Sequence, residues 1–147
     1  MTVAGIIEQY NAERPNQVDD STKLVWLKKL EKMIINEVII SHKHDLEDTT
    51  GLTLKVSGST LHITSAGTLT EHINGFDMDT ELLVPEPYDD IYIYFLDQRI
   101  ALQNNDKTRF NVATQMYNNA LLTYQQYFNR TYPTIRKPQR TFRHEWL

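Results

Sequence analysis

Hydrophobic residues at the start of the chain recur at intervals of three and four, which places them on one face of a helix. The residues of this face are Val3, Ile6, Ile7 and Tyr10. Thr2 is a suitable N-cap, and Pro15 with Asn16 ends the pattern. We therefore expect a short amphipathic helix that docks on the rest of the protein, because so short a helix is marginal alone.

A second, longer helix is predicted from Asp20 or Ser21, both good N-caps, to about His42. Its apolar stripe is wide, as expected for a helix that two neighbours cover. The stripe comprises Trp26, Leu27, Leu30, Met33, Ile34, Val38 and Ile40. The polar positions between them predict a solvated side made of Lys28, Lys29, Glu31 and Lys32.

The hydrophobic period changes to two between about residues 46 and 75. Apolar and polar residues alternate over 52–56 and again over 61–63, and Gly58-Ser59 between them suits a two-residue turn. We expect a β-hairpin inserted between the second and third helices. Because only one of its faces is apolar, it should rest on another surface. An acidic loop at 75–81 follows it.

Two aromatic-rich helices are predicted between Leu82 and Pro133, joined by a polar turn at 103–106. The first follows Pro85-Glu86-Pro87, since proline is favoured at the first helical position. Its core face comprises Tyr88, Ile91, Tyr92, Phe95 and Leu102, with Tyr94, Leu96 and Ile100 beside it. The core face of the second comprises Phe110, Ala113, Tyr117, Ala120, Leu121, Tyr124, Tyr127 and Phe128. The predicted fold class is mainly α: a bundle of one short N-terminal helix and three longer ones, with the hairpin insertion and an extended C-terminal tail.

Charge divides the chain into two parts. Residues 1–129 carry ten basic and eighteen acidic residues, net −8, whereas residues 130–147 carry five basic residues and one acid, net +4. We therefore predict a domain over 1–133 and a basic, aromatic docking arm over 134–147. The chain has no cysteine, which suits a reducing cytosol. Its apolar runs are far shorter than the roughly 20 residues of a membrane span, so no membrane association is expected.

Catalytic motifs are missing from the sequence, and neither an enzymatic role nor a cofactor is expected. His42-Lys43-His44-Asp45 is better explained as a helix end than as a metal site, because two histidines at i, i+2 do not share a helical face. Asp77, Asp79 and Glu81 resemble part of a calcium loop but lack its glycine and its later glutamate. A solvated acidic loop is the preferred interpretation of these three residues.

The helices resemble those of the head–tail connector (adaptor) proteins of tailed bacteriophages and prophages of Gram-positive bacteria. The resemblance rests on LLVPEPYDDIYIYFLDQRI, RFNVATQMYNNA and YFNRTYP, and on the earlier VWLKKLEKMIINEVI. It covers about two thirds of the chain. The segment 45–75 departs from the family pattern, so its role is not carried over.

The resemblance implies a structural virion subunit, made in the host cytoplasm and placed at the head–tail interface. Such subunits form a ring, usually of twelve, beneath the portal protein. The ring extends the channel for duplex DNA, without reading its sequence, and offers a docking site for the next neck or tail-completion protein. The family's C-terminal segment grips the portal. The corresponding candidate residues here are Arg136, Lys137, Arg140, Phe142, Arg143 and Trp146.

Two further contacts follow from the resemblance. Asp77, Asp79 and Glu81 would repel phosphates if they lay near the channel, or they could contact a neighbouring subunit. The hairpin around Gly58 is the other candidate, for a neighbouring subunit or a downstream neck protein. The basic arm leaves two alternatives open. It could pack on its own acidic body, or it could bind nucleic acid in a small regulatory protein, with arginine and tryptophan contacting backbone and bases.

Overall fold

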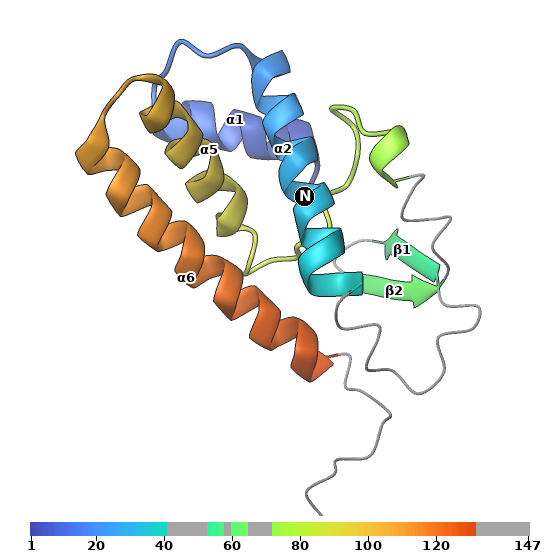
Figure 1. Ribbon diagram of the computed structural model, residues 1–147. Helices are drawn as coiled ribbons and strands as arrows, with labels where there is room; N and C mark the ends of the chain where they lie inside the picture. Colours follow the sequence, from blue (N-terminus) through green and yellow to red (C-terminus); the bar gives the residue numbers. More distant parts are fainter. Residues whose placement is uncertain (41–52, 58–59, 65–71, 132–147) are drawn as a thin grey trace, which may run out of the picture.

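A computed structural model describes residues 1–40, 53–57, 60–64 and 72–131 of the chain. The described part is mainly helical, which confirms the predicted fold class at that level. Its helices are α1 (Val3–Glu13), α2 (Asp20–Ile34), the π-helix η1 (Ile35–Ile40), α5 (Asp90–Gln103) and α6 (Lys107–Thr131). Figure 1 shows α6 along the outer edge of the bundle, antiparallel to α5, with α1 and α2 on the other side of α5.

The N-terminal helix forms as the hydrophobic pattern predicts. Thr2 caps α1, its Oγ1 accepting a hydrogen bond from the Gly5 N–H at 3.1 Å. The predicted face is buried, and it comprises Val3, Ile6, Ile7 and Tyr10. These residues belong to one core with the apolar stripes of α2 and α5. The marginal stability of a short helix is thus offset by tertiary packing.

The second helix differs from the prediction in its N-cap and in the hydrogen bonding of its last turns, and its predicted end at about His42 lies outside the described residues. Its N-cap is Asp19, one residue earlier than expected, and the Asp19 side chain makes no capping hydrogen bond. The α-helical hydrogen bonding ends at Ile34, and the helix continues as η1 through residue 40. A run of β-branched residues lies here, and such residues favour the α-helix less than unbranched ones. In η1, Ile35, Val38 and Ile39 remain buried.

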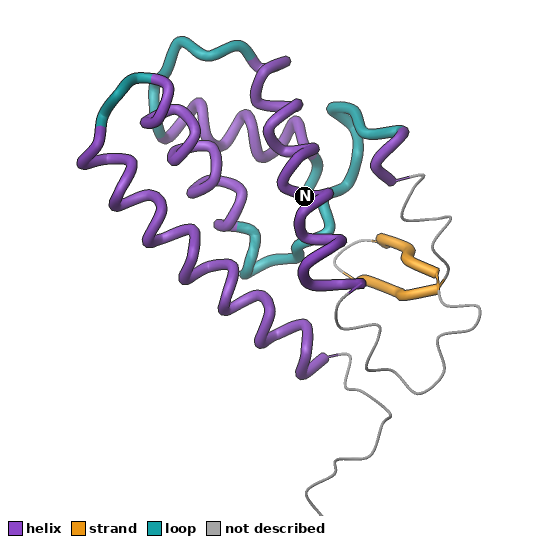
Figure 2. The backbone as a smooth tube through the Cα atoms, in the orientation of Figure 1, coloured by secondary structure: helices purple, strands orange, loops and turns teal. Residues whose placement is uncertain are grey.

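The third and fourth predicted helices form the aromatic pair α5 and α6. Across their interface the ring centroids of Phe95 and Tyr117 lie 5.5 Å apart, and those of Tyr88 and Tyr127 lie 4.4 Å apart. At the polar turn, Asn105 has φ 57°, a left-handed conformation that asparagine tolerates. The turn that joins α5 to α6 comprises only residues 104–106 and is short compared with the two helices (Figure 2).

Two expectations for α5 are wrong. The helix begins at Asp90, so Pro87 lies in the preceding turn, after a cis peptide bond, and not at the first helical position. Leu102, predicted to be core, is 55% exposed near the end of α5. Residues from nearly all sides of α5 are buried instead, because α1, α2 and α6 all pack against it.

The β-hairpin insertion is not supported as a packed element of this fold. Two short strands, β1 (Thr53–Ser57) and β2 (Thr60–Thr64), pair antiparallel, with Leu54 opposite Ile63. The turn residues Gly58 and Ser59 lie outside the described residues, as do the flanking segments 41–52 and 65–71. The surface on which this β-element would rest therefore stays a prediction.

A buried carboxylate holds the centre of the bundle together, and it belongs to a residue that the sequence pattern placed in solvent. Glu31 on α2 is fully buried. Its Oε1 accepts the Leu83 N–H at 2.9 Å and lies 3.1 Å from Nε2 of His72. Its Oε2 accepts the Tyr92 hydroxyl of α5 at 2.8 Å. One side chain thus links α2, the segment before α5, and α5 itself.

The Tyr92 hydroxyl completes this cluster. It accepts the Val84 N–H at 2.9 Å while it donates to Glu31. Burial, and then the Glu31 carboxylate, raise the pKa of Tyr92 well above its usual value, so the phenol keeps its proton and remains a donor. The segment 82–84 is buried and cannot bond to water, so these two side chains satisfy the backbone N–H groups of Leu83 and Val84.

We predict that Glu31→Ala will lower the free energy of unfolding by about 3 kcal/mol, because the Leu83 N–H and the Tyr92 hydroxyl lose their buried acceptor. Glu31→Gln should cost less, since the amide oxygen can still accept one of the two bonds. Urea denaturation followed by circular dichroism measures both. Glu8→Ala on the exposed side of α1 is the control. Equal losses for Glu31→Ala and Glu8→Ala would contradict the role assigned to the buried carboxylate.

Candidate functional site

The predicted site residues fall into two groups. Asp77, Asp79 and Glu81 lie in the described segment between residues 72 and 89. The others lie outside the described residues, namely Gly58, Arg136, Lys137, Arg140, Phe142, Arg143 and Trp146. The histidine-rich helix end at 42–45 also lies outside them. The acidic loop is therefore the candidate site that lies within the described residues.

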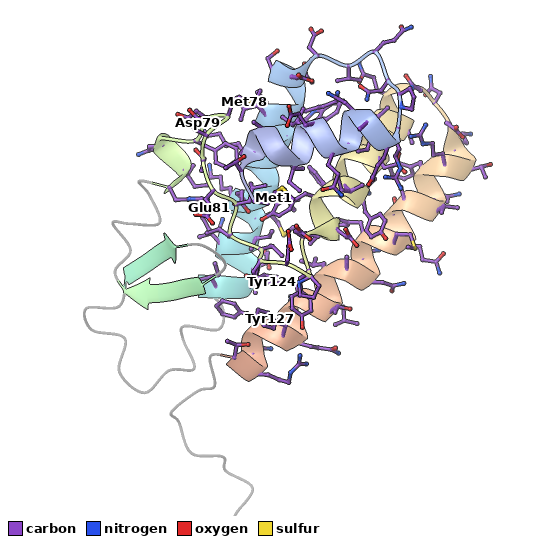
Figure 3. All side chains as sticks on the ribbon, turned by 180° about the vertical axis from the view of Figure 1, so that it is seen from behind. Met1, Met78, Asp79, Glu81, Tyr124 and Tyr127 are labelled. Carbon is purple, nitrogen blue, oxygen red and sulfur yellow. The ribbon has the colours of Figure 1, made fainter. Side chains whose placement is uncertain are left out.

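The backbone of the acidic loop is hydrogen-bonded to the N-terminus of α1. The Val3 and Ala4 N–H groups donate to the carbonyl oxygens of Thr80 and Met78, at 3.0 and 2.9 Å. The Leu82 N–H donates to the Met1 carbonyl at 2.9 Å, and Thr2 forms an isolated antiparallel bridge with Glu81. Figure 3 shows Met78, Asp79 and Glu81 beside Met1 at this end of the molecule. The first N–H groups of a helix have no partner within the helix, and here a distant loop supplies it.

The three acidic side chains have different surroundings within this loop. Oδ1 of Asp77 accepts the Asp79 N–H at 2.9 Å and the Thr80 hydroxyl at 3.1 Å. The Thr80 Oγ1 in turn accepts the Asp77 N–H at 2.8 Å. Asp77 thus holds the turn, while the side chain of Asp79 is exposed and that of Glu81 half-buried. The backbone of residues 78–82 lies at the positive end of the α1 dipole, an end that favours negative charge.

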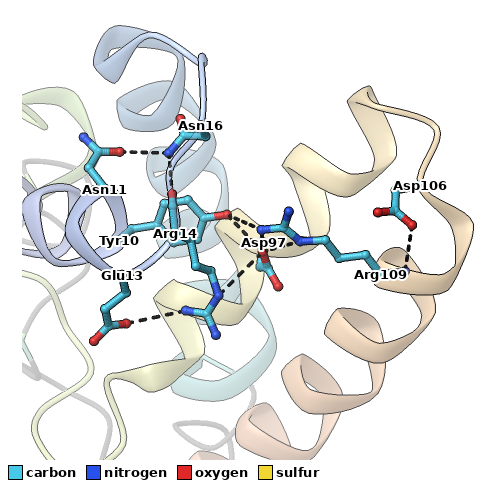
Figure 4. A network of polar contacts seen from close by, with 8 residues as sticks. All are labelled: Tyr10, Asn11, Glu13, Arg14, Asn16, Asp97, Asp106 and Arg109. Carbon is cyan, nitrogen blue, oxygen red and sulfur yellow. Dashed lines mark hydrogen bonds and ion pairs between the residues drawn. The ribbon is translucent and has the colours of Figure 1, made fainter.

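A second polar cluster joins three helices at the opposite end of α1 (Figure 4). Oδ1 of Asp97 on α5 accepts the Tyr10 hydroxyl of α1 at 3.0 Å and Nε–H of Arg109 on α6 at 3.0 Å. Nη2 of Arg109 also donates to Asp97, and Nε of Arg14 lies 3.8 Å away. Hydrogen bonding to Asp97 raises the pKa of Arg109, so the guanidinium stays charged. Burial, and then Asp97, raise the pKa of Tyr10, which keeps its proton.

Sequence reasoning missed the buried charges, although a signal for them is present. Glu31 lies four residues after Leu27 and three before Ile34, which places it on the apolar stripe. Lys23 lies four residues before Leu27, and Asp97 lies four residues after Ile93, so both are also at core spacing. Lys23 is only 1% exposed, and its Nζ donates to the Asn11 side chain at 2.6 Å and to the Val18 carbonyl at 3.0 Å. A charge at core spacing is the pattern that indicates such a buried, bonded group.

The described part of the chain contains hollows between its helices. One hollow, of about 450 Å³, lies between the α1–α2 loop and the end of α5, and Asp19 is the one carboxylate in its lining. Its lining comprises Asn16, Gln17, Val18, Asp19, Thr22, Gln103 and Asn104. Among the described residues no three histidine, aspartate or glutamate side chains gather as a metal site would require. None of the helices described is long and apolar enough to cross a membrane.

In the acidic loop the carboxylate of Asp77 holds the turn, whereas that of Asp79 is not needed for folding. We predict that Asp77→Ala will lower the free energy of unfolding by about 1 kcal/mol, because the turn loses an acceptor for two hydrogen bonds. The matched variant Asp79→Ala should stay within about 0.5 kcal/mol of the parent protein. Urea denaturation of the two variants side by side tests this difference. Indistinguishable curves would show that Asp77 does not hold the turn.

Comparisons with protein families, with curated proteins and with solved structures find no match to this chain. The resemblance to head–tail connector proteins thus stays a prediction from the sequence.

Proposed function

We propose that this protein is a structural subunit of a phage or prophage head–tail connector. Its copies form a ring beneath the portal protein, and DNA passes through the ring without any reaction being catalysed on it. The observation that carries the proposal is the contrast between an acidic helical body, net −8 over 1–129, and the basic segment that follows it, net +4 over 130–147, which contains the arm at 134–147. The sequence resemblance of the helices supports the same assignment. In this role the protein acts in the virion, after assembly in the host cytoplasm.

The body has the properties that a docking subunit needs. Its described helices are locked to one another by buried polar clusters at Glu31, Lys23 and Asp97, so the body is suited to remain rigid during assembly. The arm at 134–147 follows α6, the longest described helix, which ends at Thr131. A rigid body with a basic, aromatic extension fits a partner surface that is acidic and has pockets for Phe142 and Trp146. In the proposed assembly this partner is the portal ring.

The remaining surfaces are assigned by the same proposal. The acidic loop at Asp79 and Glu81 would face the channel, where it would repel the passing DNA phosphates. Alternatively, it would contact a neighbouring subunit. The finer part of the predicted fold, an inserted β-hairpin around Gly58, would contact a neighbouring subunit or the downstream neck protein. The ring would contain about twelve copies, as the resemblance implies.

Deleting residues 134–147 tests the arm. The truncated protein should keep the thermal midpoint of the full chain, and its affinity for the portal ring of the same phage should fall by about 100-fold, because the charge steering and two aromatic anchors are lost. The point variants Phe142→Ala and Trp146→Ala should each lose part of this affinity. Sedimentation of portal rings with bound protein measures the binding.

The arm experiment also separates the connector from the alternative regulatory protein. Binding of duplex DNA across a salt series should stay weak for the connector. A steep salt-dependent DNA affinity that disappears with the arm would favour the regulator. Truncated protein that joins particles as well as the full chain would refute the connector proposal.

The acidic loop is tested by reversing charges that the fold does not use. Asp79→Lys combined with Glu81→Lys leaves Asp77 in place to hold the turn. If the loop faces the channel, these charges will attract DNA phosphates and slow genome ejection or retain DNA in the particle. Glu8→Lys with Glu86→Lys changes the net charge equally at two other exposed positions and serves as the control. Ejection is measured by release of DNA from purified particles. If it is unchanged in the Asp79→Lys, Glu81→Lys variant, the loop does not face the channel.

A further inference from the structure

The turn that leads into the acidic loop contains a chemically labile pair of residues. Asn74 is followed by Gly75, and no other asparagine of the chain precedes a glycine. The amide carbon of an asparagine side chain lies within reach of the backbone nitrogen of the next residue. Glycine has no Cβ, so it leaves this nitrogen open to approach and its backbone free to turn. Both residues are exposed, so water reaches them.

The backbone at Asn74 can open while the fold around it is kept. The described helical residues here are 72–74, so Asn74 is the last residue of a short helical turn, and helix ends fray. The segment is anchored on both sides of the labile pair. Nε2 of His72 lies 3.1 Å from Oε1 of Glu31, and Phe76 is buried in the core. Local opening between these anchors gives Asn74 the extended conformation in which its side chain meets the next nitrogen.

The reaction expected of this pair consumes water and releases ammonia. The Gly75 nitrogen, once hydroxide has taken its proton, attacks Cγ of Asn74, and the side-chain nitrogen leaves as ammonia. The cyclic imide that results joins the side chain of residue 74 to the nitrogen of residue 75. Water then adds to either carbonyl carbon of the ring and breaks the bond from that carbon to the nitrogen. One opening gives aspartate. The other gives isoaspartate, in which the main chain runs through the former side chain.

We infer that Asn74 is a site of spontaneous deamidation in the folded protein. Either product adds one negative charge to a chain whose formal net charge is −4. The new carboxylate stands directly before the acidic loop, in which Asp77 and Asp79 are already exposed. This inference goes beyond the connector proposal and does not depend on it, because it concerns the chemistry of the turn and not a partner.

The isoaspartate product also changes the main chain, which becomes longer by one methylene group between residues 74 and 75. The Phe76 N–H donates to the Ile73 carbonyl at 3.3 Å, so this hydrogen bond spans the labile pair. Phe76 is buried, and Ile73 packs against the same core. The extra methylene changes the separation that the bond spans while the core holds both side chains. Isoaspartate therefore loosens the turn, whereas aspartate has the shape of asparagine and fits in its place.

Peptide mapping by mass spectrometry, on full-length protein incubated at mildly alkaline pH, tests the site. Asn74 should deamidate at least about tenfold faster than Asn104, which is also exposed in a turn but is followed by Asn105. Gly75→Ala should slow the reaction by about tenfold or more, because its Cβ hinders the nitrogen. Asn74→Gln is a second control, since the longer side chain must close a larger ring. Equal rates at Asn74 and Asn104 would overturn the inference.

The same measurement in urea shows whether the fold permits the reaction. The rate at Asn74 in the folded protein should lie within about tenfold of the rate in the unfolded chain, because opening of the turn is local. Greater protection by the fold would overturn the inference, since the residue would then react only after global unfolding.

Thermal midpoints compare the two products. Asn74→Asp supplies the charge alone and should melt with the parent protein. Aged protein enriched in isoaspartate by ion exchange should melt about 3 °C lower or more, because the turn is loosened. Asn74→Gln protein aged in the same way should not change. Isoaspartate protein that melts with Asn74→Asp would overturn the loosening assigned to the longer main chain. Portal binding by the arm is measured separately, and neither result bears on it.

Discussion

The buried carboxylate of Glu31 is the interaction on which the arrangement of the helices depends. An ionisable group with no solvent exposure is tolerated only when its hydrogen-bonding capacity is satisfied, and here three groups converge on it. They come from α5, from the segment before α5 and from residue 72, where the described chain resumes. The position of α2 is thereby fixed relative to two other parts of the chain. An apolar side chain at this position would fill the space but would leave two buried donors without an acceptor.

The other buried charges work in the same way at the edges of the core. Asp97 joins α5 to α1 and α6 through Tyr10 and Arg109, and Lys23 joins α2 to the end of α1 and the loop after it. In each case one charged side chain on an apolar stripe binds partners from a different helix. Apolar packing alone tolerates sliding and rotation of helices, whereas these bonds have fixed directions. The polar clusters therefore specify one arrangement of a bundle whose core is otherwise aromatic and aliphatic.

The surfaces assigned to partners are those that the core does not use. The backbone of the acidic loop hydrogen-bonds to the N-terminus of α1, so the carboxylates of Asp79 and Glu81 are not needed for this contact. The arm after α6 carries the opposite sign of charge to the body. A rigid acidic body with separate contact surfaces is what a subunit of a larger assembly requires, and this is the basis of the connector proposal.

The sequence by itself determined the helices and much of the core. The three- and four-residue spacing of apolar residues predicted α1, α2, α5 and α6, and the hydroxyl of Thr2 identified the cap of α1, because these features depend on neighbours in the chain. Only the tertiary structure decided the environment of Glu31, which local polarity had placed in solvent, and of Leu102, which the pattern had placed in the core. Burial depends on which helices pack on which faces. The bonds to Glu31 come from residues 41 to 61 positions away, so no local pattern could specify them.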